Sequence, residues 1–173
     1  RVHPADDVQQ ALGAIIRATL RRGGSVLLPS FAVGRAQALL LVIQRLKAAG
    51  EIPVDVPVYL DSPMATTATT LYQKHRRLLR ITPREAGALC DGVHVVTTPA
   101  MSEKLTRSRY PAIIVSASGM ATGGRVLHHL KAMAPHPRHH IVFPGFQVGG
   151  TRGAKLIAGA TEVKIFGEYV AVK

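Results

Sequence analysis

Residues 112–125, AIIVSASGMATGGR, join a short apolar run to a turn of small and hydroxyl residues, with a helix predicted to begin near Thr122. Backbone N–H groups and hydroxyls at such a turn can converge on a phosphate-sized volume. The stretch is not a Walker loop, because no Lys-Ser or Lys-Thr pair follows Gly124, and it lacks G-x-G-x-x-G spacing. It is not a nucleophile elbow, because Ser118 has no glycine two residues before it. Taken alone, a tight turn that needs small residues only for packing explains it equally well.

The rest of the chain repeats this alternation of apolar run and helix. Short apolar runs that predict strands occur at Ser25–Pro29, Val56–Leu60, Val93–Thr97, Ala112–Ser116 and Ile141–Phe143. Helices are predicted at Asp7–Arg21, at Gly34–Ala49, from Asp61-Ser62-Pro63 through Leu79, and at Pro83–Leu89. Residues 163–172 predict a β-hairpin that turns at Gly167-Glu168.

Apolar strands separated by helices are typical of a parallel sheet that is covered on both faces. The sequence therefore predicts an α/β fold: a three-layer, Rossmann-like domain with a mostly parallel central sheet and a C-terminal β-hairpin. No repeat, low-complexity tract or linker interrupts residues 1–173, so we expect a single domain.

The loops after the carboxyl ends of parallel strands share one edge of the sheet, and ligands bind there. Each of these loops precedes a helix-compatible segment, and the free N–H groups and dipole at a helix start attract anions. The loops are residues 30–34, 61–66, 98–102, 116–124 and 145–151.

Charge is the clearest compositional signal. The chain has 22 Lys and Arg against 10 Asp and Glu, which gives a net charge of +12 and a pI near 10.7. A polyanion such as a nucleic acid is the expected partner, although a generally basic protein would show the same balance. With four Tyr, four Phe and no Trp, we do not expect base stacking to be the main binding mode.

Other residue types argue against several classes of protein. Cys90 is the single cysteine, so an internal disulfide is excluded and a reducing cytoplasm is expected. The longest apolar stretch, residues 36–43, is too short to span a membrane. The eight histidines show no metal-binding spacing, so we expect no metal site in this chain.

Four stretches carry a family resemblance. They are LPSFAVGRAQ (28–37), VYLDSPMA (58–65), IVSASGMATGGR (114–125) and FPGFQVGGTRG (143–153). In order and spacing they resemble the β-CASP region of metallo-β-lactamase-fold ribonucleases, including the endonuclease subunit that cleaves eukaryotic messenger-RNA 3′ ends. The bacterial homologues of that subunit look most similar.

The resemblance implies that residues 1–173 form one β-CASP domain, with 1–5 and about 161–173 leading from and back to a lactamase domain. That lactamase domain would hold two zinc ions and activate hydroxide against a phosphodiester. The family's zinc ligands do not match any position here, so we expect no catalytic residue in this segment. The implied partners are RNA or DNA and the lactamase domain, a homodimer is left open, and no membrane is involved.

The resemblance also assigns site residues. Those expected near RNA phosphates are Ser116, Ser118, Gly119, Met120, Gly124, Arg125, Gln147, Thr151, Arg152 and Arg35. Asp61 and Ser62 are expected to support the same edge. Two other hypotheses stay open, namely a catalytically inactive scaffolding paralogue and a free-standing nucleotide-binding module.

Overall fold

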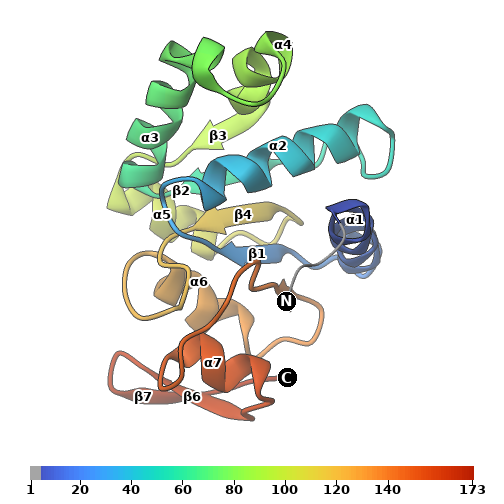
Figure 1. The fold of residues 1–173 in the computed structure, drawn as a ribbon. Coiled ribbons are helices and arrows are strands. Elements are labelled where there is room, and N and C mark those ends of the chain that lie inside the picture. Colours follow the sequence, from blue (N-terminus) through green and yellow to red (C-terminus); the bar gives the residue numbers. More distant parts are fainter. Residues whose placement is uncertain (1–4) are drawn as a thin grey trace.

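The computed structural model describes residues 5–173, and its centre is a five-stranded parallel sheet in the order β3-β2-β4-β1-β5 (Figure 1). Every hydrogen-bonded pair of neighbours in this sheet is parallel, which confirms the predicted architecture. Each strand overlaps a predicted apolar run, although β5 begins one residue earlier than expected. The strands are β1 Val26–Pro29, β2 Val58–Asp61, β3 Val93–Val95, β4 Ile113–Ser116 and β5 His140–Ile141.

Helices alternate with these strands along the chain (Figure 1). Several begin with a hydroxyl side chain that accepts a hydrogen bond from a backbone N–H of the first turn, which stabilises an otherwise unpaired helix start. Ser62, Thr98 and Thr151 do this for α3, α5 and α7. The helices are α1 Ala5–Arg21, α2 Arg35–Ala48, α3 Pro63–Lys74, α4 Pro83–Gly87, α5 Pro99–Thr106, α6 Val126–Met133 and α7 Arg152–Ile157.

Two apolar cores lie on opposite faces of the sheet because successive strand residues point to opposite sides. Leu28 and Val115 face the core that contains residues of α1, α2 and α3. Leu27 and Ile114 face the core that contains residues of α5, α6 and the C-terminal hairpin. The sheet is therefore buried on both faces, as its apolar strands predict.

The C-terminal hairpin, β6 Glu162–Ile165 and β7 Glu168–Ala171, packs its buried side chains into the second core. Ile165 pairs with Glu168, so the turn is Phe166-Gly167 and the predicted turn at Gly167-Glu168 was wrong by one residue. Both turn residues have positive φ, at 51° and 86°, as a two-residue type I′ turn requires. Glycine at the second turn position meets that requirement without strain.

Two helix predictions were also wrong. The helix opened by Pro63 ends at Lys74 instead of Leu79, because the backbone leaves the helical region at His75 and residues 76–78 form a 3-10 turn. The helix after β4 begins at Val126 instead of Thr122, because the residues before it form a closed turn. Residues 1–4, which carry most of the predicted N-terminal connection, lie outside the described residues. Within residues 5–173 no helix is long and apolar enough to cross a membrane.

The start of α4 predicts an acid-dependent contribution to stability. The Glu85 carboxylate accepts hydrogen bonds from Arg45 at 2.7 and 2.9 Å and from the N–H and hydroxyl of Thr82. The Arg45 guanidinium first, and then Thr82, lower the pKa of Glu85 from 4.5 to about 2. Because the folded pKa lies below the unfolded one, this stabilisation is complete above pH 4.5 and is lost as the pH falls toward 2.

We therefore expect Glu85→Gln to unfold at a lower urea concentration than the wild type. This difference in the urea midpoint should be largest near neutral pH and should become smaller in acid. Urea titrations between about pH 7 and about pH 3 would measure it. Asp91→Asn, at an exposed position, serves as the control. A Glu85→Gln deficit that does not change with pH would contradict the assignment.

Candidate nucleic-acid interface

The loops after the five parallel strands lie along one edge of the sheet, on the left in Figure 1. Strand order places the turn after β4, residues 117–125, between the loops that follow β2 and β1. A Cβ atom added to Gly119 would lie 2.9 Å from the backbone nitrogen of Phe31, so these loops are in close contact. The structure therefore brings the predicted turns together at one edge.

A buried carboxylate, Asp61 at the end of β2, ties three of these loops together. Its two oxygens accept hydrogen bonds from Ser102 Oγ at 2.5 Å, Arg125 Nη1 at 2.8 Å and His129 Nε2 at 2.7 Å. Burial alone would raise the pKa of the Asp61 carboxyl, but the hydrogen bonds from His129, Ser102 and Arg125 outweigh it and hold the pKa below 3.8. Asp61 is therefore an ionised anchor.

Arg125 is part of this anchor. Its guanidinium also donates to the carbonyl oxygens of Val96 and Thr97 at the end of β3, at 2.9 and 3.1 Å. The side chain thus spans β2, β3 and β4, and is mostly buried. Arg125 acts as a support for the edge, the role predicted for Asp61 and Ser62, and its contact with phosphate stays a prediction.

The turn after β4 is closed on itself by Ser118. Its hydroxyl accepts hydrogen bonds from the N–H groups of Thr122 and Gly123, at 3.1 and 3.3 Å. Gly124 has φ of 78° and Ser116 donates its hydroxyl to the carbonyl of Asp61, so both residues fix the backbone path. Among the described residues, no acceptor pairs with the N–H groups of Gly119 and Met120.

A second set of contacts reaches this turn from the loop after β5. Gln147 Nε2 donates to the carbonyl of Gly119 at 3.0 Å, and the Gly153 N–H donates to the carbonyl of Met120 at 3.0 Å. Arg152 Nη1 donates to the carbonyls of Ala121 and Thr122, at 3.1 and 3.2 Å. Thr151 accepts a hydrogen bond from the N–H of Ala154 at the start of α7. Of the predicted residues, Gln147 and Arg152 therefore hold the turn from its other side, whereas Thr151 caps α7.

Arg35 differs from the other predicted arginines. It lies at the first position of α2, its side chain is exposed, and its guanidinium makes no hydrogen bond or ion pair with any described residue. A Cβ atom added to Gly145 would lie 3.9 Å from Arg35 Nε, so this guanidinium stands beside the loop after β5. Arg35 is the predicted cation that is free to bind an anion at this edge.

Several residues at this edge were not identified from sequence. Phe31 and Phe146 are 49% and 81% exposed and follow the neighbouring strands β1 and β5. Ser102 and His129 bind Asp61 from 41 and 68 residues away along the chain. Exposed aromatics after a strand are a usable sequence signal, whereas the partners of Asp61 have no local signal.

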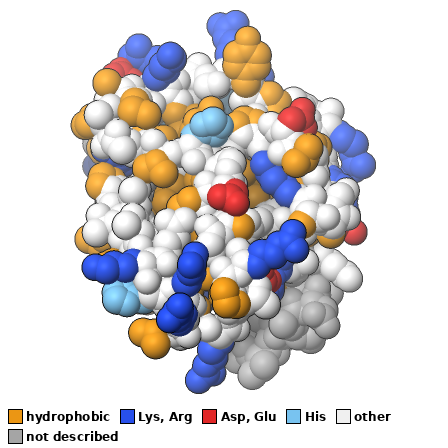
Figure 2. Space-filling model, turned by 90° about the horizontal axis from the view of Figure 1, so that it is seen from above, with side chains coloured by type: hydrophobic (Ala, Val, Ile, Leu, Met, Phe, Trp, Pro, Cys, Tyr) orange, Lys and Arg blue, Asp and Glu red, His pale blue; other side chains and the backbone are white. Residues whose placement is uncertain are grey.

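Positive charge is spread widely over the surface. Figure 2 shows Lys and Arg side chains outnumbering Asp and Glu on the face seen from above, dispersed among hydrophobic side chains. The net charge of +12 therefore gives a general attraction for polyanions. It does not by itself locate a site on that face.

Together the parallel sheet, the interlocked turns at its carboxyl edge and the C-terminal hairpin define a Rossmann-like α/β domain. Comparison with known proteins gives its family. The Beta-Casp domain family model matches residues 36–156. The chain belongs to the Beta-Casp domain family.

Three relatives illustrate the range of this family. Ribonuclease TTHA0252 of Thermus thermophilus is 40% identical over 168 residues, which cover 92% of this chain and 38% of that protein. Transcription termination factor FttA of Pyrococcus abyssi is 36% identical over 171 residues, covering 95% and 26%. An RNase J-like protein of Methanocaldococcus jannaschii is 33% identical over 159 residues, covering 91% and 37%. The chain thus spans between about a quarter and two fifths of the length of these relatives.

Proposed function

We propose that this chain is the RNA-binding cap of a zinc-dependent metallo-β-lactamase/β-CASP ribonuclease, with RNA lying along the carboxyl edge of the central sheet. Membership of the Beta-Casp family supports a nuclease, and two of the relatives carry ribonuclease in their names. DNA is the alternative substrate. The lactamase domain is the proposed partner that completes the cleft.

The unpaired guanidinium of Arg35 is the observation that carries the proposal. Arginine recognises phosphate through a planar set of donors, and a guanidinium already bonded to carbonyl oxygens has fewer donors left for a ligand. Arg125 and Arg152 are bonded in this way, whereas Arg35 is exposed and free. The N–H groups of Gly119 and Met120 add uncharged donors for phosphate oxygens on the same edge.

Two exposed rings supply a second type of contact. Phe31 and Phe146 follow neighbouring strands, so an extended strand of RNA at this edge can place unstacked bases against them. Stacking on aromatic rings tolerates any base, because every base has a π face. This contact adds to phosphate binding and does not replace it.

The implied zinc ions have no fitting site in the described part of this chain. Among the side chains that the structure describes, from residue 8 onward, no three His, Cys, Asp or Glu come together to hold a metal ion. The histidine closest to a carboxylate, His129, is fully buried and bonded to Asp61 and Thr106. We therefore assign the zinc ions to the lactamase domain and derive no catalytic step from this chain.

Arg35→Gln should weaken binding of a short single-stranded oligoribonucleotide, because one phosphate contact is removed. Fluorescence anisotropy between about 50 and 200 mM salt should give a slope of log affinity against log salt that is smaller by about 0.7. The affinity loss should be similar for different sequences, because phosphate contacts carry no sequence information.

Arg21→Gln is the matched control, because it removes the same charge at a different place. Arg21 ends α1 and precedes β1, so it lies toward the amino ends of the strands, opposite the carboxyl edge that is proposed to bind RNA. It should change the affinity much less than Arg35→Gln. Equal losses for the two variants would mean that overall charge, and not this edge, binds RNA. Tight binding of a mononucleotide would favour a free-standing nucleotide-binding module.

A further inference from the structure

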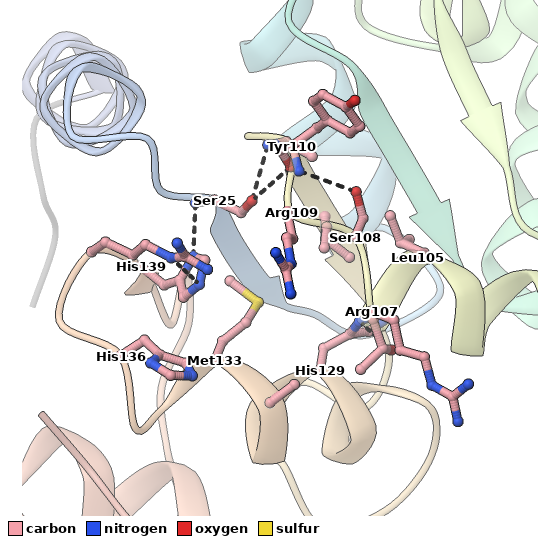
Figure 3. A pocket seen from close by; sticks show the side chains of 15 residues that line it. Ser25, Leu105, Arg107, Ser108, Arg109, Tyr110, His129, Met133, His136 and His139 are labelled. Atoms are coloured by element: carbon pink, nitrogen blue, oxygen red, sulfur yellow. Dashed lines mark hydrogen bonds between the residues drawn. The ribbon is translucent and has the colours of Figure 1, made fainter.

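A small hollow lies at the amino ends of β1 and β4, at the opposite end of the strands from the proposed RNA edge (Figure 3). Its volume is about 210 Å³. The buried side chains of Ile114 and Met133 contribute an apolar floor. Its walls are formed by Ser25, residues 105–110, His136, Arg138 and His139.

The polar lining of this hollow combines arginine and histidine side chains with the hydroxyl residues Ser25, Thr106, Ser108 and Tyr110. Arg109, Arg138, His136 and His139 line it, and none of its described lining residues is Asp or Glu. The guanidinium of Arg109 points into the hollow (Figure 3) and makes no hydrogen bond or ion pair with a described residue. Arg107 is turned outward and pairs with Glu103. Among the described lining residues no carboxylate offsets the charge of Arg109, so the hollow attracts anions.

Hydrogen-bond donors also exceed acceptors around His139. Its Nδ1 faces the N–H of Ser25 at 2.9 Å, and its Nε2 faces Nε of Arg138 at 3.1 Å. A neutral imidazole has one N–H and one lone pair, so it can accept only one of these two hydrogen bonds. At least one donor at the wall of the hollow therefore lacks an acceptor.

Two groups compete for one ring nitrogen in an adjoining hollow of about 340 Å³, which shares His136 and His139 with the first. There Arg22 Nη2 and Thr19 Oγ1 both contact Nδ1 of His140, at 2.5 and 2.8 Å. The Thr19 hydroxyl already donates its proton to the carbonyl of Ile15. His140 Nδ1 therefore either donates to Thr19, which leaves Arg22 Nη2 without this acceptor, or accepts from Arg22, which leaves the Thr19 oxygen without a donor. A donor is left over only in the first arrangement.

We infer that the hollow at the amino end of the sheet binds a phosphate-type oxyanion, with Arg109, His136 and Arg138 as its donors. A tetrahedral oxyanion brings only acceptors and negative charge, and none of the described lining residues is a carboxylate that could supply that charge. The volume of the hollow is below the roughly 300–1,000 Å³ of drug-sized ligand sites, so a phosphate group fits it better than a whole nucleotide. The inference does not rest on the proposed function.

The histidine environment agrees with this assignment. Burial first, and then the positive charges of Arg138 and His136, lower the pKa of His139. A bound oxyanion would offset these charges. The rings of His136 and His139 lie 6.1 Å apart between centroids, close enough for one anion to contact both.

The test follows the histidine ring resonances of the 173-residue chain by NMR while sodium phosphate or sodium sulfate is added at constant ionic strength. The resonances of His136 and His139 should shift to saturation with both anions, with a dissociation constant on the order of 1 mM. Arg109→Gln should raise this constant by about fivefold or more, since a charged donor is lost. Arg84→Gln, which removes an exposed arginine on α4, should leave it unchanged.

Shifts that do not saturate, or equal effects of the two variants, would overturn the site. A short oligoribonucleotide without a terminal phosphate then distinguishes two sources of the anion. Displacement of sulfate from His136 and His139 by this oligomer identifies the phosphodiester backbone as the ligand. Unchanged shifts at these histidines, with RNA bound elsewhere, identify a small phosphorylated molecule or free phosphate.

Discussion

Asp61→Asn should lower the free energy of unfolding by about 3–5 kcal/mol, the loss that follows when one partner of a buried ion pair is removed. The substitution keeps the shape of the side chain but removes its charge and one acceptor. Arg125 and His129 would then face an amide whose N–H₂ group is itself a donor. Urea unfolding monitored by circular dichroism would measure the change.

Asp91→Asn provides the control, because Asp91 is exposed and its carboxylate makes no hydrogen bond or ion pair with a described residue. Surface changes of this kind stay within about 0.5 kcal/mol. A loss below about 1 kcal/mol for Asp61→Asn would show that the network is not a strong anchor. The pKa of Asp61 is lowered from its ordinary value of 3.8, so its stabilisation is present above that pH and is lost as the pH falls through the lower folded-state pKa. The variant should lack this acid sensitivity.

Gly124→Ala should destabilise the protein by about 2–4 kcal/mol, through two separate effects. Gly124 has φ of 78°, a conformation that costs an L-amino acid about 1–2 kcal/mol. An added Cβ would also lie 2.7 Å from the carbonyl oxygen of Ala117, which is backbone and cannot rotate away. The turn after β4 would have to open, so oligoribonucleotide binding should weaken as well.

Gly123→Ala is a closely matched control. The neighbouring glycine has no positive φ, and nothing lies within 4 Å of a Cβ built there. We expect a change in stability within about 0.5 kcal/mol and unaltered RNA binding. If thermal unfolding of the two variants were the same, the strain assigned to Gly124 would be wrong.

The layers of the fold follow from sequence pattern because burial on both faces forces strands such as Ile113–Ser116 to be apolar throughout. Element ends were less predictable. The helix after β4 was expected at Thr122, but the hydroxyl of Ser118 captures the N–H groups that would have started it. The same sequence is compatible with both outcomes, and the closed turn is chosen by its contacts with Asp61 and Gln147.

The predicted site residues lie together at one edge of the sheet, and their contact with RNA stays a prediction. Arg125, Arg152 and Arg35 look alike in sequence, since each follows or precedes glycine in a loop-to-helix segment. In the structure two of them bond to backbone carbonyls and one stays free. Whether an arginine is free depends on which carbonyls the packed loops bring within reach, and neighbouring residues in sequence do not encode this.

Sequence by itself determined the parallel sheet, the placement of the small-residue turns at one edge and the resemblance to the β-CASP family. These depend on local periodicity and on short motifs, whose physical causes act within a few residues. Only the tertiary structure decided that Asp61 is bound by Ser102 and His129, 41 and 68 residues away, and that unmatched donors meet at His139. Hydrogen-bond partners across such separations are set by strand order and loop packing, which the chain acquires only when the whole domain folds.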